Sequence, residues 1–167
     1  MNSYSIFCDA SFSSTRKISV LGYLCLKEED DLLDATEEMV CVKEVSAVTN
    51  IRSELECIIW ALESIQKTVK DDLVEIQLYT DCESLAGLIN RRDRLFDTEF
   101  ISKRQKKELS NADLYRVFFD LVDDLNPEIS WVKGHMPNSK RNFIQSNFAL
   151  VDRTVRKLRR NNNNIAV

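Results

Sequence analysis

Four carboxylates stand where the surrounding apolar pattern calls for a buried residue: Asp9, Glu54, Asp81 and Asp152. A buried, unpaired carboxylate costs several kcal/mol, so each of them needs a partner. Carboxylates that lie close together also raise one another's pKa, unless divalent cations neutralise them. Such hard oxygen ligands suit Mg²⁺ or Mn²⁺ rather than Zn²⁺. Two such ions can activate a water and stabilise a leaving oxygen, which is the chemistry of phosphodiester hydrolysis.

Three of these carboxylates also have an ordinary structural explanation. Glu54 would be favourable at a helix N-terminus through the helix dipole. Asp81 could cap the helix that follows it, and Asp152 could pair with Arg156 one helical turn later. Asp9 is the hardest to explain in this way, because the interior of a strand offers no cap. Taken together, the four residues indicate a divalent-metal site.

The elements that must position these residues follow from the hydrophobic periodicity. Strand-like runs cover 4–8, 20–26, 39–45, 75–79 and 128–132, and helical spacing covers 50–67, 83–90, 112–125 and 143–160. The polar, basic segment 91–110 is either a helix or an exposed excursion. The order βββαβα(α)βα predicts an α/β fold in which helices flank a mixed five-stranded sheet. Ligands of such sheets gather beyond the carboxyl ends of the parallel strands, where Asp81 lies.

Composition limits the remaining classes. The chain has 167 residues, 44% hydrophobic and 30% charged, which predicts one globular domain over 1–160 with a polar tail over 161–167. We find no apolar run long enough to span a bilayer and no signal-peptide pattern, so no membrane association is expected. The five cysteines form no CxxC pair. They are interpreted as small buried thiols in a reducing cytoplasm rather than a zinc site.

The formal net charge of −4 conceals an uneven distribution. Acidic residues dominate 1–90, whereas 91–107 and 133–160 are basic. Basic segments on an acidic body could hold an anionic polymer, or they could simply be solvated helix faces. Charge alone leaves both interpretations open.

Four motifs carry a resemblance to a known family. TNIRSEL (49–55), LYTDCESL (78–85), NADLYRVFFDLV (111–122) and WVKGH (131–135) stand in one chain, in this order. They resemble the motifs of type I ribonuclease H, and WVKGH matches its motif residue for residue. The resemblance runs from about Tyr4 to Arg160, and it implies the ribonuclease H-like fold.

The resemblance also implies roles for particular residues. Asp9, Glu54, Asp81 and Asp152 are similar to the family's four metal-binding carboxylates, which hold two Mg²⁺ or Mn²⁺ ions. His135 resembles a loop histidine that aids proton transfer and product release, and Thr49 and Asn50 match positions that contact phosphate and sugar 2′-hydroxyl groups. The implied reaction is endonucleolytic cleavage of the RNA strand of an RNA–DNA hybrid. The hybrid is the implied partner, and no obligatory protein partner is evident.

Several positions depart from the family pattern. Residues 10–19 replace a glycine-rich turn, Ile51 replaces an asparagine, and Ala47 stands where a basic residue is common. The segment 91–107 has no tryptophan, and the stretch between His135 and Asp152 is long. These departures keep open a nucleic-acid-binding or interaction protein with weak or no hydrolysis. The fold alone also leaves open a DNA resolvase or exonuclease.

Overall fold

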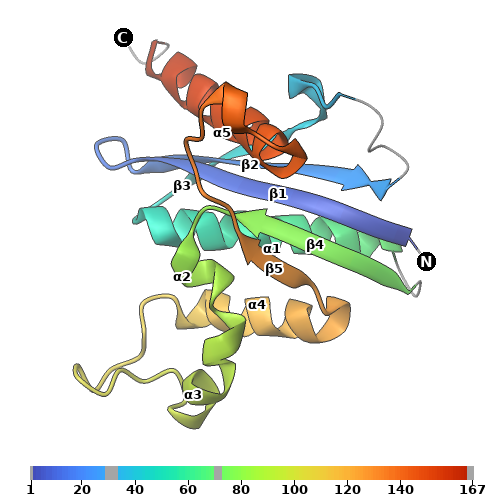
Figure 1. The fold of residues 1–167 in the computed structure, drawn as a ribbon. Helices are drawn as coiled ribbons and strands as arrows, with labels where there is room; N and C mark the ends of the chain where they lie inside the picture. The colour runs from blue at the N-terminus through green and yellow to red at the C-terminus, as the bar shows by residue number, and fades with distance from the viewer. Residues whose placement is uncertain (1, 29–33, 70–72, 165–167) are drawn as a thin grey trace.

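The computed structural model describes residues 2–28, 34–69 and 73–164. Its centre is a five-stranded sheet in the order β3-β2-β1-β4-β5 (Figure 1). The strands are β1 (Asn2–Ser13), β2 (Ile18–Lys27), β3 (Cys41–Ser46), β4 (Val74–Thr80) and β5 (Glu128–Trp131). The pairs β1–β2 and β2–β3 are antiparallel, whereas β1–β4 and β4–β5 are parallel. The predicted mixed α/β sheet is confirmed.

Helices cover both faces of this sheet. They are α1 (Asn50–Val69), α2 (Glu83–Ala86), α3 (Arg92–Asp97), α4 (Ala112–Leu125) and α5 (Phe143–Asn164), with short 3₁₀ helices at Glu37–Met39, Ile89–Arg91 and Asn138–Lys140. Helix α5 packs on β1 and β2 from one side, and α1 packs on the same strands from the other, with α4 beside it (Figure 1). No helix among the described residues has the length and apolar character to cross a membrane.

Strand β1 is buried on both faces because its side chains alternate between two apolar clusters. Ile6 and Cys8 belong to the cluster under α1 and α4, whereas Phe7 belongs to the cluster under α5. A central strand of a sheet that is covered on both faces shows this continuous apolar run, which is why the strand was evident in the sequence. Asp9 therefore follows three residues that are fully buried.

The structure differs from the predicted boundaries in four places. Strand β1 continues past Asp9 to Ser13, so the carboxylate lies inside the strand. The predicted helix over 83–90 stops after Ala86, because Gly87 forms its C-cap, and a 3₁₀ turn follows. Segment 91–110 is a short helix followed by an irregular loop with a bridge between Ile101 and Glu108. Helix α5 continues to Asn164, so residues 161–164 of the expected polar tail extend the helix, and 165–167 lie outside the described residues.

The cysteine prediction is correct only in part. All five thiols are free, and Cys8 and Cys57 are buried as expected. Cys41 is exposed, because it begins the edge strand β3, in which five of the six residues are exposed.

Helix α5 approaches the sheet closely at Gly22, which pairs with Asp9 across the β1–β2 ladder. A Cβ atom placed on Gly22 would clash with Cγ1 of Val155, which is fully buried. Val151 and Val155 of α5 therefore lie directly against the backbone of β2 at this point. Only glycine permits this contact.

We expect Gly22→Ala to lower the free energy of unfolding by about 1–3 kcal/mol, because the new methyl group pushes α5 away from the sheet. Urea denaturation measures the change. In a Val155→Ala background the same substitution should cost clearly less, because the clashing methyl groups of Val155 are gone.

Gly87→Ala is the matched control for this prediction. The nearest atom to a Cβ at Gly87 is the Glu83 carbonyl oxygen at 3.6 Å, an ordinary contact. This variant should keep wild-type stability or gain slightly. Equal effects of alanine at Gly22 and Gly87 would show that the approach of α5 does not constrain the fold.

Candidate active site

Strand register brings Asp9 and Asp81 together. The parallel pairing of β1 with β4 runs to Phe7 opposite Tyr79. Two residues beyond this pair, Asp9 of β1 lies level with Asp81, which directly follows the last residue of β4. Because β4 ends at Thr80 and β1 continues, the side of β1 at Asp9 is open to side chains from elsewhere.

Glu54 enters this open space from the second turn of α1, which begins at Asn50. Thr49 caps that helix: its hydroxyl oxygen accepts the backbone N–H of Arg52 at 3.3 Å. Glu54 then lies on the buried face of the helix and is only 4% exposed. Its Oε2 atom is buried and has no hydrogen-bond partner among the described residues. A favourable helix dipole does not explain an unsatisfied buried oxygen, so the purely structural explanation of Glu54 is insufficient.

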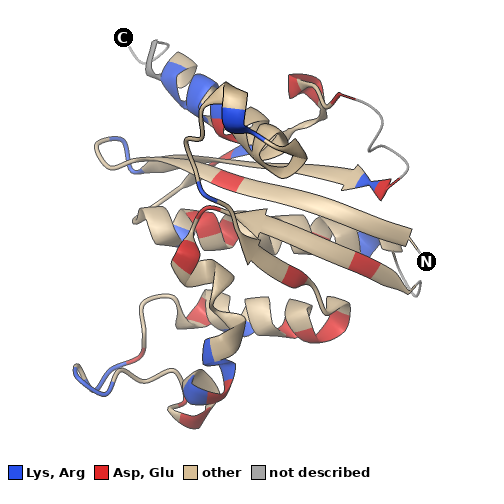
Figure 2. Cartoon of the chain, viewed as in Figure 1, with Lys and Arg blue, Asp and Glu red and all other residues tan. Residues whose placement is uncertain are grey.

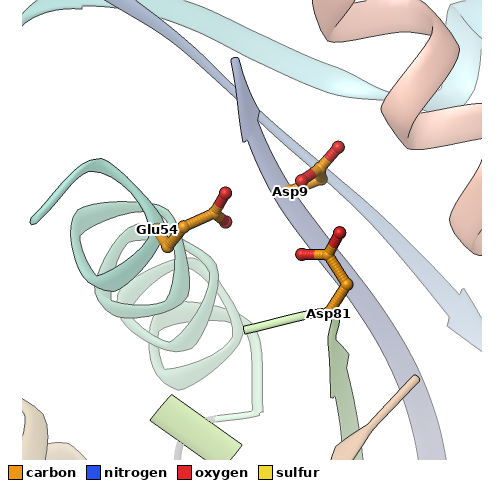
Figure 3. A group of neighbouring side chains, drawn as sticks. All are labelled: Asp9, Glu54 and Asp81. Atoms are coloured by element: carbon orange, nitrogen blue, oxygen red, sulfur yellow. The ribbon is translucent and has the colours of Figure 1, made fainter. Parts of the chain in front are cut away.

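Asp9, Glu54 and Asp81 form one cluster, with a carboxylate oxygen of each within 4.8 Å of the others (Figure 3). Burial and the charge of Asp81 raise the pKa of Asp9 well above its usual value. Burial and the charge of Asp9 do the same to the pKa of Glu54. Burial, then the charge of Asp152, raise the pKa of Asp81, which His135 and Arg156 partly offset. The protein alone therefore cannot keep all three ionised without cost.

Asp152 lies beside this cluster rather than inside it. It extends from α5, lines the same hollow as Asp9, and helps to raise the pKa of Asp9. Its Oδ1 atom also accepts from Nε of Arg156 at 2.8 Å, so the expected pairing one turn along the helix is present. Asp152 thus forms the ion pair with Arg156 that the structural explanation predicts, and it also lies beside the carboxylate cluster, as the metal-site explanation requires.

Two residues that support Asp81 were missed in the sequence. The indole nitrogen of Trp131 donates to the backbone carbonyl of Asp81 at 3.1 Å. Gly134 passes so near that a Cβ atom there would lie 3.1 Å from Oδ2 of Asp81. The WVKGH motif is therefore partly a support for this carboxylate. The identical match to the motif was the available signal, but the structure was needed to show what the residues contact.

His135 is exposed at the rim of the cluster, with a φ of 58°. Its Nε2 atom lies 3.1 Å from Nη2 of Arg156. Because a guanidinium only donates, Nε2 must accept, which places the ring proton on Nδ1. A non-glycine residue in the left-handed region carries local strain, and such strain concentrates at functional loops.

The two expected substrate-contact residues lie in different hollows. Asn50 lines a hollow of about 500 Å³ together with all four carboxylates. Thr49 lines a neighbouring hollow formed by the start of α1 and residues 108–113.

Cys82, rather than Asp81, is the N-cap residue of α2, so the capping explanation of Asp81 does not hold.

The residues of this cluster fit a hard divalent cation. The donors are all carboxylate oxygens, one of them a buried orphan, and the raised pKa values show the electrostatic cost that a cation would remove. Asp9, Glu54 and Asp81 can converge on one ion, and Asp152 lies near enough to help hold another.

Comparison with known proteins agrees with this geometry. The model of the family described as RNase H matches residues 1–157. The chain belongs to the ribonuclease H family. This ribonuclease H family member is 32% identical over 100 residues to a protein named Ribonuclease H from Francisella philomiragia subsp. philomiragia, and the match covers 58% of the chain. It spans 62% of that relative, somewhat less than two thirds of its length.

Solved ribonuclease H domains share its fold. The solution structure of the prototype foamy virus RNase H domain superposes with a TM-score of 0.64 at 16% identity, covering 93% of this chain and 92% of that one. The protease-reverse transcriptase of the same virus gives 0.68 at 16% identity, covering 93% of this chain and 20% of that one. LC11-RNase H1, isolated from compost, gives 0.56 at 20% identity, covering 95% and 99%. At these identities the likeness concerns the fold.

We expect the cation-free protein to lose stability as pH rises from about 4. A raised carboxyl pKa means that the folded state binds more protons than the unfolded state between the ordinary pKa and the raised one, so unfolding becomes easier across that window. Asp9→Asn removes one buried charge and relieves its two neighbours. In EDTA at pH 8 it should raise the free energy of unfolding, because one of three mutually repelling charges is gone.

Urea denaturation at pH 5 and pH 8 tests this, with and without Mg²⁺. The gain from Asp9→Asn should be smaller at pH 5, and Mg²⁺ should stabilise the wild type more than the variant. Asp120→Asn removes the same charge from an exposed position of α4 and is the control. A gain that is the same at both pH values would contradict the carboxylate-repulsion account.

Proposed function

We propose that this chain hydrolyses the RNA strand of RNA–DNA hybrids, as an endonuclease that uses two divalent cations, Mg²⁺ or Mn²⁺. The observation that supports this most is the buried carboxylate cluster with the unpartnered Glu54 oxygen. Structural ion-pair networks do not leave such a group unsatisfied, whereas a metal site does. Membership of the ribonuclease H family and the similarity to a protein named Ribonuclease H give the substrate class.

Each site residue has a physical task in this proposal. Asp9, Glu54, Asp81 and Asp152 would hold the cations, and bound cations would supply Lewis acidity and charge neutralisation at the phosphate. Trp131 and Gly134 keep Asp81 in place. His135 places an imidazole at the rim, beside Arg156, where it would act in proton transfer. Asn50 lines the same hollow and would contact the sugar edge, where a 2′-hydroxyl distinguishes RNA from DNA.

The charge distribution supports an anionic polymer as substrate. Basic side chains gather along α5 and in the loop after α3, on either side of the acidic cluster (Figure 2). The loop carries Lys103, Arg104, Lys106 and Lys107, all exposed. Such a loop would attract phosphates without base specificity.

The free cysteines fit a reducing compartment, so we propose that the protein acts in the cytoplasm.

The test is cleavage of a hybrid with either strand labelled, in Mg²⁺, in Mn²⁺ and in EDTA. We expect cutting of the RNA strand alone, lost in EDTA. Glu54→Gln should reduce the rate by more than about 100-fold, beyond the loss typical of groups that only orient a metal ligand. Glu56→Gln is the matched control, because Glu56 lies on the same helix but bonds to Arg52.

The other outcomes each point to a different function. A hybrid that binds but stays intact in both metals would identify a binding protein on this fold. Cutting of duplex DNA included as a competitor would indicate a DNA nuclease. Equal rates for Glu54→Gln and Glu56→Gln would contradict the proposed site.

A further inference from the structure

The hollow that contains the carboxylates has a second, positively charged half. Its lining continues from Asp9 along β1 to Ser11, and along α5 from Asp152 to Arg159 and Arg160. Asp9 and Ser11 point to the same face of β1, because they are two residues apart. Asp152 and Arg159 share one side of α5, being two helical turns apart. At one end of the hollow the carboxylates of Asp9 and Asp152 therefore face each other. At the other end the Ser11 hydroxyl faces the Arg159 guanidinium.

Ser11 fixes Arg159 in this half of the hollow. Nε of Arg159 donates to Oγ of Ser11 at 2.7 Å, and Ser11 is only 8% exposed. The bond uses one donor and leaves both terminal nitrogens of the guanidinium without a protein acceptor among the described residues. No carboxylate of the described chain pairs with Arg159 or Arg160. This differs from Arg156, which is engaged by Asp152 and His135, and from Lys157, which pairs with Glu37.

A half-buried arginine that is held at Nε and free at its outer nitrogens is arranged to grip a phosphate with two parallel hydrogen bonds. The hydroxyl proton of Ser11 adds a third donor. Residues i and i+2 of a strand lie about 6.6 Å apart, which is comparable to the spacing of neighbouring phosphates in one nucleic-acid strand. A strand whose cleaved phosphate lies at Asp9 would therefore place the adjacent phosphate at Ser11.

We propose that Ser11, Arg159 and Arg160 form a phosphate subsite for the linkage next to the cleaved one, on the same RNA strand. The inference rests on the proposed function, because it assumes that the cleaved phosphate lies at the carboxylates. The subsite sets strand register: it holds the RNA backbone on the α5 side while the carboxylates act on the next linkage. Arg159 carries most of the contact, and exposed Arg160 adds charge at the mouth of the hollow.

The first test uses kinetics of the full chain on one short hybrid whose main cleavage position has been mapped with the wild type. Arg159→Gln should raise KM about tenfold, as expected for losing one charged hydrogen-bonded contact, and change kcat less than twofold. Arg159→Lys keeps the charge but loses the paired geometry, so it should recover part of the loss. Lys157→Gln removes one charge from the same helix outside the hollow and is the control.

The second test places one neutral methylphosphonate linkage on either side of the mapped position. At one of these two positions the neutral linkage should raise the KM of the wild type but have no further effect on the KM of Arg159→Gln. At the other position it should raise the KM of both proteins by the same factor. This coupling between one residue and one linkage would not arise if Arg159 only tied α5 to β1, and urea denaturation of each variant checks that tie directly.

A binding measurement supplies a readout that does not depend on cleavage. In an Asp9→Asn background, the slope of log affinity against log salt should become shallower by about 0.9 when Arg159→Gln is added, the value for one phosphate contact on a duplex. Wild-type KM, unchanged salt slope and no methylphosphonate coupling in folded Arg159→Gln would overturn the subsite. Failure of the wild type to cut the hybrid would instead overturn the proposed function itself.

Discussion

Mutual repulsion among buried carboxylates is the constraint on which this structure depends. The parallel register of β1 and β4 places Asp9 level with Asp81, and the second turn of α1 adds Glu54, so three carboxylates share one small space. The fold tolerates this because strands and helices with extensive apolar cores hold the backbone in place regardless of the charges. The repulsion lowers the stability of the fold, but the carboxylates are already in place for a ligand. Functional centres commonly combine these two properties.

Helix α5 connects this acidic centre to the basic end of the same hollow. One side of the helix carries Asp152 next to the cluster, then Arg156 against Asp152 and His135, then Arg159 against Ser11. Charge thus changes sign along a single rigid element, from the side that would hold cations to the side that would hold phosphate. Placing both on one helix fixes their separation more firmly than two loops would.

The sequence predicted those features that depend on local periodicity or on a residue out of pattern. The bounds of α4 are as predicted, because a strong apolar stripe precedes Asn126-Pro127, and Asn126 adopts the left-handed cap conformation. Asp9 was recognisable because it interrupts a run of buried residues. The support of Asp81 by Trp131, and the anchoring of Arg159 by Ser11 148 residues away, were not predictable, because such contacts depend on tertiary geometry that no local pattern contains.

The contact of α5 with the backbone at Gly22 has a consequence for the long connection before that helix. Since Gly22 pairs with Asp9, the valines resting on Gly22 position α5 directly against the strand that carries the first carboxylate. Contacts with the sheet, and not the length of the preceding chain, therefore fix the position of Asp152. The chain between His135 and the start of α5 can therefore differ in length without displacing it. The unusually long interval after His135 is therefore a permitted variation in loop length, and not a defect of the site.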